Sequence, residues 1–132
     1  MAILGIDYGR KRIGIALSEG IFSSPLKVLT VSSINGTHLH IERLCKELAV
    51  TKVVIGLPGG TMGEEVKRFG RKLYELLHIP VIFFDETLTS RDALRGMIAS
   101  GKKKKSRRVD IDAYAASLIL QSYLNEQATP ST

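Results

Sequence analysis

The sequence of 132 residues has one cysteine, no tryptophan and no long uninterrupted apolar run. A single cysteine excludes an intramolecular disulfide, and the helical apolar pattern around Cys45 predicts a small buried side chain. No apolar stretch approaches the roughly 20 residues of a membrane-spanning helix, and Asp7 interrupts the first apolar residues before they reach signal-peptide length. We therefore expect a cytoplasmic protein with no membrane association, folded as one domain over residues 1–132 with a frayed tail from about residue 126.

The positive charge is concentrated in one segment. The formal net charge is +6, and the run KKKKSRR at residues 102–108 holds six of the 19 bases. Without these six, the remaining bases would balance the 13 acids. A localised basic run is typical of proteins that bind a phosphate backbone, although a solvated loop without a partner has the same composition. We expect nucleic acid to contact Lys102, Lys103, Lys104, Lys105, Arg107 and Arg108.

Apolar patterns along the chain predict five strands and four helices. Residues 2–8 are predicted as a strand that is buried on both faces, residues 12–18 alternate as its partner strand, and the short link between them permits a hairpin. The further strands are expected near residues 26–31, 52–57 and 79–86, with a glycine-rich loop at 59–63. The expected helices cover about residues 35–49, 64–77, 89–101 and 110–125.

The order of these elements predicts an α/β fold. The three opening strands require antiparallel pairing, whereas the later alternation of helices and strands requires parallel pairing with right-handed crossovers. A mixed five-stranded sheet with helices on both faces satisfies both requirements. The first three strands would be antiparallel, and the later strands would run parallel to the first.

Acidic residues stand where two predicted strands end. Asp7 ends the first strand, and Asp85 and Glu86 end the fifth. Open α/β sheets bind ligands beyond the carboxyl ends of their strands. Successive side chains of a strand point to opposite faces, so Asp85 and Glu86 cannot both face the same site. The pattern alone does not choose between them.

The last predicted helix offers two further acids. Small and apolar neighbours at helical spacing favour a sheet-facing position for Asp112, although an acid in the first turn can also serve only the helix dipole. Asp110 suits an N-cap.

Carboxylates that meet at a sheet edge repel one another, and Mg²⁺ or Mn²⁺ would relieve that repulsion. Two such ions can activate a water and stabilise the leaving oxygen of a phosphodiester, and we expect phosphates to pass Arg10, Lys11 and Arg12.

Four segments together resemble one family. LGIDYGRKRIGIALS, VVIGLP, DETLTS and VDIDAYAASLILQSYL occur in the order of the YqgF family, and the resemblance extends over residues 3–124. Its members are compact RNase H-like proteins, described as Holliday-junction resolvases and as nucleases that mature the end of pre-16S ribosomal RNA. The resemblance implies an RNase H-like sheet and a catalytic, metal-binding set of Asp7, Glu86 and Asp112.

The resemblance therefore implies a metal-dependent nuclease of structured nucleic acid, most consistent with pre-16S ribosomal RNA maturation. A resolvase of branched DNA and a non-catalytic, nucleic-acid-binding ribosome-assembly factor are the alternatives, and both a monomer and a homodimer remain open. Three positions depart from the family pattern: Thr87, where arginine is usual, the glycine pair 59–60, and Glu19, where aspartate is frequent.

Other functions fit the motifs less well. The first segment also resembles the phosphate loop of actin-like ATPases and sugar kinases, but those proteins clamp nucleotide between two domains. The run GLPGGTMG lacks the Gly-Lys-Ser/Thr of a P-loop. The three histidines, His38, His40 and His78, have no zinc-binding spacing with Cys45.

Overall fold

The computed structural model describes residues 1–88 and 104–128, and the side chains of residues 1–87 and 111–128. One five-stranded sheet forms the centre of the molecule, in the order β3-β2-β1-β4-β5. Pairs β1/β2 and β2/β3 are antiparallel, and pairs β1/β4 and β4/β5 are parallel, which confirms the predicted mixed sheet. The strands are β1 (Ala2–Asp7), β2 (Arg12–Ser18), β3 (Ser23–Thr30), β4 (Val50–Leu57) and β5 (Val81–Asp85).

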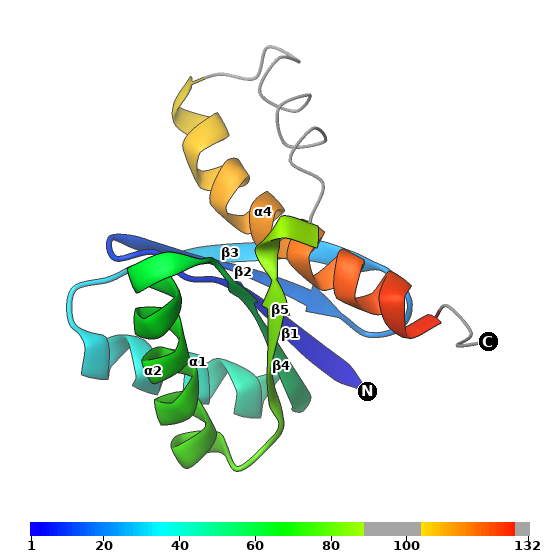
Figure 1. Ribbon diagram of the computed structural model, residues 1–132, viewed down its shortest axis with the longest axis horizontal. Helices are drawn as coiled ribbons and strands as arrows, with labels where there is room; N and C mark the ends of the chain where they lie inside the picture. Colours follow the sequence, from blue (N-terminus) through cyan, green and yellow to red (C-terminus); the bar gives the residue numbers. More distant parts are fainter. Residues whose placement is uncertain (89–103, 129–132) are drawn as a thin grey trace.

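Helices cover both faces of this sheet. On one face lie α1 (Ile34–Glu47) and α2 (Gly60–Leu77), and α4 (Lys104–Ala128) crosses the other, as Figure 1 shows. A short 3-10 helix, η1 (Glu86–Leu88), follows β5 directly. Among the described residues, no helix is both long and apolar enough to cross a membrane.

The alternation of strand side chains divides the core in two. Leu4 and Ile6 of β1 are fully buried against α1 and α2, in the larger cluster. Ile3 packs in the smaller cluster under α4, and Gly5 lies close to Leu120 of that helix. A Cβ on Gly5 would lie 2.8 Å from the Cβ of Leu120, so the helix rests almost directly on the strand. By the same alternation, Asp7 belongs to the α4 face of β1.

Several boundaries differ from the sequence prediction. The glycines at residues 59–63 predict a loop, but α2 begins at Gly60, whose φ of 70° provides the sharp entry into the helix. β3 begins at Ser23 and includes Pro25, which has no N–H to donate and is tolerated because β3 is an edge strand with a register irregularity at this point. α1 begins at Ile34, where the Oγ of Ser33 accepts a bond from the amide of Gly36.

The predicted start of the last helix is also wrong. α4 begins at Lys104 rather than at Asp110, so Asp110 lies inside the helix and is not its N-cap. Lys and Arg are good helix formers, and no Gly or Pro separates them from Asp110, so the helix extends through the basic run. At the other end α4 continues to Ala128, past the predicted beginning of the tail. The helix predicted at 89–101 lies outside the described residues.

Candidate active site

Asp7 and Glu86 lie on the same face of the sheet, at the ends of two strands. Ile82 and Phe84 of β5 pack under α4, so the alternation predicted for this strand is confirmed and directs Glu86 to that face. Gly56 of β4 makes room for it, because a Cβ there would lie 3.0 Å from both the Cγ and an Oε of Glu86. Glu86 therefore sits beside the carboxyl end of β4, and Asp7 ends β1, the neighbouring strand.

The other acid of the pair, Asp85, is occupied locally. Its Oδ1 accepts hydrogen bonds from the amide nitrogen of Thr87 at 2.9 Å and from the Oγ1 of Thr87 at 2.8 Å. These two bonds lower the pKa of the Asp85 carboxyl and close the first turn of η1. Thr87, which stands where the family usually has arginine, thus serves the backbone turn that presents Glu86.

Asp112 reaches the same edge from α4. Gly14 of β2 pairs directly with Asp7 in the antiparallel ladder. A Cβ on Gly14 would overlap the carbonyl oxygen of Asp112, so the helix backbone lies against the strand at this point. The absence of a side chain at Gly14 is what allows α4 to bring Asp112 close to Asp7.

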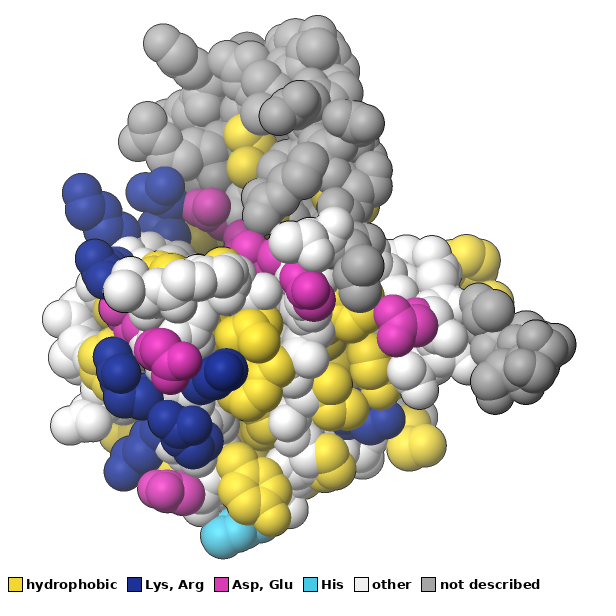
Figure 2. All heavy atoms as spheres, in the orientation of Figure 1, with side chains coloured by type: hydrophobic (Ala, Val, Ile, Leu, Met, Phe, Trp, Pro, Cys, Tyr) yellow, Lys and Arg dark blue, Asp and Glu magenta, His cyan; other side chains and the backbone are white. Residues whose placement is uncertain are grey.

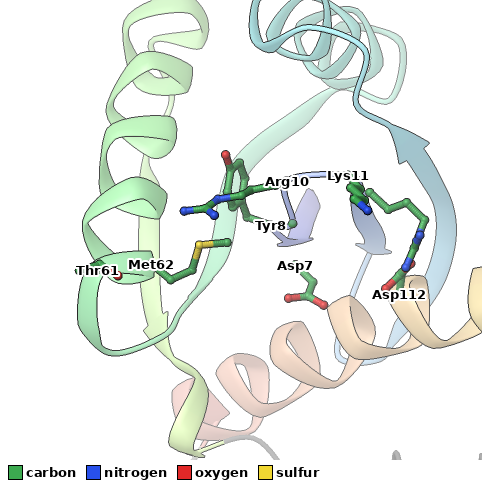
Figure 3. Close-up of a pocket in the computed structure, with 9 residues that line it drawn as sticks. Asp7, Tyr8, Arg10, Lys11, Thr61, Met62 and Asp112 are labelled. Atoms are coloured by element: carbon green, nitrogen blue, oxygen red, sulfur yellow. The ribbon is translucent and has the colours of Figure 1, made fainter.

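Asp7 and Asp112 line one open pocket of about 580 Å³ at the carboxyl end of β1. In Figure 3 the carboxyl group of Asp7 lies between α4 and the β1–β2 turn, with Asp112 on one side and Met62 on the other. The remaining walls come from the turn after β1 and from the first turn of α2. The lining residues are Asp7, Tyr8, Gly9, Arg10, Lys11, Arg12, Thr61, Met62 and Asp112.

An ion pair spans the pocket between β2 and α4. The Nε of Arg12 donates to the Oδ2 of Asp112 at 2.7 Å, and both side chains are partly exposed. The sequence predicts that Arg12 contacts phosphates, which stays a prediction; the structure shows in addition that Arg12 pairs with a candidate catalytic acid. The pair joins residues separated by 100 positions, which no local sequence pattern reports.

A second network orders the turn after β1. The guanidinium of Arg10 contacts Glu65 of α2, with its terminal nitrogen 2.9 Å from Oε1. The hydroxyl of Tyr8 donates to the other Oε at 2.7 Å. Burial, followed by this bond to Glu65, raises the pKa of Tyr8 to about 12. The bonds from Arg10 and Tyr8 lower the pKa of Glu65, which therefore stays ionised.

The remaining predicted cations differ in their positions. Lys11 lines the pocket, is exposed, and has no ion-pair partner among the described residues, which suits it to an incoming phosphate. Lys104, Lys105, Arg107 and Arg108 belong to the first turns of α4, whereas Lys102 and Lys103 lie outside the described residues.

The three candidate acids share a sheet edge without forming one closed cluster. Asp7 and Asp112 line the pocket, but Glu86 does not. Within the described ranges, no three Asp, Glu, His or Cys side chains stand close enough together to hold a metal ion. The donors themselves fit a hard divalent cation, because the described lining of the pocket offers carboxylate oxygens and no thiolate or imidazole, and the thioether of Met62 is a poor ligand for such an ion.

Sequence reasoning missed three contributors to this region. Thr61 and Met62 line the pocket because the first turn of α2 replaces the predicted loop. Glu65 bonds Arg10 and Tyr8, although the sequence pattern predicts only that it belongs to a helix. Its position on α2 does not indicate this role, because both partners lie more than fifty residues away in the chain. Cys45 is buried as predicted, and burial raises the pKa of its thiol to about 11.

The mixed sheet, with acids at two strand ends and a third acid on the helix that crosses it, defines an RNase H-like fold of the resolvase type. The fold matches the Thermus thermophilus RuvC structure in complex with a Holliday junction substrate, with a TM-score of 0.64 at 13% identity, covering 98% of each chain. It also matches the fowlpox virus resolvase in complex with Holliday junction DNA, with a TM-score of 0.62 at 16% identity over 98% of this chain and 100% of that one.

The chain belongs to the RuvX family, described as Holliday junction resolvase, whose model matches residues 1–126. A relative from Caldanaerobacter subterraneus is 41% identical over 96% of this chain and 98% of its own length, and one from Syntrophus aciditrophicus is 44% identical over 95% and 89%. Both carry the name "Putative pre-16S rRNA nuclease". These matches confirm the family resemblance and identify the protein as a nuclease, a hydrolase of nucleic-acid phosphodiester bonds. Nucleases of this class generally use divalent metal ions.

Proposed function

We propose that this protein is a divalent-metal-dependent nuclease that cleaves precursor 16S ribosomal RNA in the cytoplasm, with Asp7, Glu86 and Asp112 as its catalytic acids. The observation that carries the proposal is the meeting of Asp7 and Asp112 in one pocket, with Glu86 on the same face beside the end of β4. The relatives named for pre-16S ribosomal RNA are similar over nearly the whole chain, which supports RNA as the substrate.

Different side chains of the protein have separate roles around the scissile phosphate. Asp7 and Asp112, with Glu86 after a side-chain adjustment, would hold one or two Mg²⁺ or Mn²⁺ ions. These ions, when bound, supply Lewis acidity at phosphorus and lower the pKa of a water. Lys11 neutralises a phosphate at the pocket mouth, and the Arg10–Glu65 pair keeps the turn after β1 in place. The basic start of α4 attracts the remaining backbone.

The test compares a fragment of precursor 16S ribosomal RNA with a four-way DNA junction, in Mg²⁺ and in Mn²⁺. Asp7→Asn, Glu86→Gln and Asp112→Asn should each lower the cleavage rate about 100-fold or more, because each removes several kcal/mol of charge stabilisation from the transition state. Asp85→Asn is the matched control, because asparagine keeps the Oδ1 that accepts both bonds from Thr87, so the turn before Glu86 should persist and cleavage should stay close to wild type.

The same experiment separates the alternatives. Cleavage of the junction but not of the RNA would favour a resolvase, which the family description and the two fold neighbours support. A resolvase that cuts two strands symmetrically also requires a two-fold dimer, which sedimentation measures directly. Tight RNA binding without cleavage in either metal would favour a ribosome-assembly factor and contradict the proposal.

A further inference from the structure

A second pocket lies behind Tyr8, between the start of α1 and the middle of α2. Its volume is about 390 Å³, which lies within the range of small-ligand sites. Tyr8 lines both this pocket and the pocket of Asp7, so the two are adjacent. The lining residues are Tyr8, Ile34, Asn35, His38, Glu65, Arg68, Phe69 and Lys72.

The aromatic wall of this second pocket offers the partly exposed ring of Tyr8, which packs against Phe69, itself 4% exposed. The ring of Phe69 lies between the rings of Tyr8 and His38, with 4.7 Å between ring centroids on each side. His38 is 2% exposed, and its two ring nitrogens lie within hydrogen-bond distance of the carbonyl oxygens of Ile34 and Phe69. These contacts tie α1 to α2, so the wall is formed before any ligand arrives.

The rim of the pocket is polar and positively charged. Arg68 and Lys72 are exposed and stand four residues apart on α2, hence on one face of the helix. Asn35, also exposed, offers an amide from the start of α1. The one acid of the lining, Glu65, already bonds Arg10 and Tyr8. Figure 2 shows Lys and Arg side chains gathered over α2.

We infer that this pocket binds one unpaired nucleotide of the nucleic-acid substrate, next to the phosphate held near Asp7. The base lies against the partly exposed ring of Tyr8 and meets the amide of Asn35, while its phosphate lies between Arg68 and Lys72. Base stacking on aromatic rings and backbone contact with cations are the usual means of holding single strands. A paired base is held in its helix and cannot enter, so the preferred substrate has a single-stranded flank. The inference rests on the proposed nuclease function.

The test measures binding in EDTA, where no cleavage occurs, by fluorescence anisotropy. The probes are a single-stranded RNA of about a dozen nucleotides and a blunt RNA hairpin of the same composition. The double variant Arg68→Gln/Lys72→Gln is compared with Lys67→Gln/Arg71→Gln, which removes the same charge from the same helix at residues that line neither pocket. The pocket variant should bind the single strand about tenfold more weakly, whereas the control variant changes it by less than about threefold. The hairpin should respond equally to both variants.

A set of RNAs with one abasic site each completes the test. For the wild type, one abasic position should weaken binding about tenfold, and the pocket variant should lose that dependence. Equal weakening in both double variants, or no abasic position that matters, would overturn the inference and leave α2 as a general basic surface. Because binding is read without metal, failure here leaves the roles of Asp7, Glu86 and Asp112 untouched. Conversely, if the wild-type protein cleaves neither substrate, the binding difference between the two double variants can still be measured.

Discussion

Arg12 and Asp112 show how a candidate catalytic acid is held before a metal binds. Two carboxylates line the pocket, and the guanidinium of Arg12, 2.7 Å from Asp112, offsets the charge of one of them. A divalent cation at the same carboxylate would have to displace this guanidinium or share the oxygen with it. Arg12 therefore positions Asp112 and would compete with such a cation for its carboxylate.

Replacing Arg12 by glutamine should strengthen metal binding. We expect Mn²⁺ to bind Arg12→Gln about fivefold more tightly, on the order of 1 kcal/mol after allowance for solvent screening of this partly exposed pair. Calorimetric titration or electron paramagnetic resonance of Mn²⁺ provides the measurement. The melting temperature without metal should fall and should recover when Mn²⁺ is added.

The matched control for this prediction is Arg10→Gln, since Arg10 lines the same pocket but pairs with Glu65. It should alter Mn²⁺ affinity less than Arg12→Gln does. Unchanged or weaker Mn²⁺ binding by Arg12→Gln would show that the ion pair does not compete with the cation.

Tyr8 should titrate well above the ordinary pH range of a tyrosine. Its pKa is raised from 10.0 to about 12 by burial and by the bond to Glu65, so the folded state keeps the proton that the unfolded state loses. The resulting stability is fully present below pH 10 and is lost as the pH rises through about 12. Absorbance titration at high pH should show a late step that Tyr8→Phe removes and Glu65→Gln shifts downward. A wild type with no such step would contradict the burial of this hydroxyl.

The close approach of β2 and α4 depends on a missing side chain. Gly14→Ala would force a methyl group into the carbonyl oxygen of Asp112, and backbone cannot give way as the end of a long side chain can. We expect the free energy of unfolding, measured in urea, to fall by about 1–3 kcal/mol, together with reduced cleavage because Asp112 moves. Gly20→Ala is the control: no heavy atom lies within 4 Å of its Cβ position, so stability should change by less than about 0.5 kcal/mol. Equal effects of the two substitutions would refute the close approach.

Helix boundaries are predicted from the sequence less accurately than the helices themselves. Gly59 and Gly60 predict a loop because glycine disfavours helices, yet Gly59 is the N-cap of α2 and Gly60 its first residue. The predicted start of α4 is wrong because it depends on a capping role for Asp110, whereas the helix already begins at Lys104. Caps are short signals, and in α4 the helix-forming Lys and Arg residues before Asp110 outweigh them. Inside a helix the apolar pattern extends over several turns, and the burial that it predicts for Cys45 of α1 is confirmed.

The distribution of charge over the whole molecule should govern its affinity for nucleic acid. Lys104→Gln/Lys105→Gln should weaken RNA binding and lower the slope of log affinity against log salt by about 0.7–0.9 for each phosphate that the variant no longer neutralises. Lys27→Gln/Lys46→Gln removes the same net charge from exposed positions on β3 and α1 and should leave the slope nearly unchanged. An identical slope for both double variants would mean that the basic run contributes only net charge.

The sequence by itself determined the mixed character of the sheet and its pairing directions, because these follow from the order of the elements, and the position of Asp7 at the end of β1, because this follows from apolar periodicity over a few neighbouring residues. Only the tertiary structure turned Arg12 toward Asp112, made Gly56 the neighbour of Glu86, and joined Tyr8 to Glu65. Those contacts link residues tens of positions apart, and their geometry depends on how closely α2 and α4 approach the sheet. A one-dimensional pattern contains no measure of that distance.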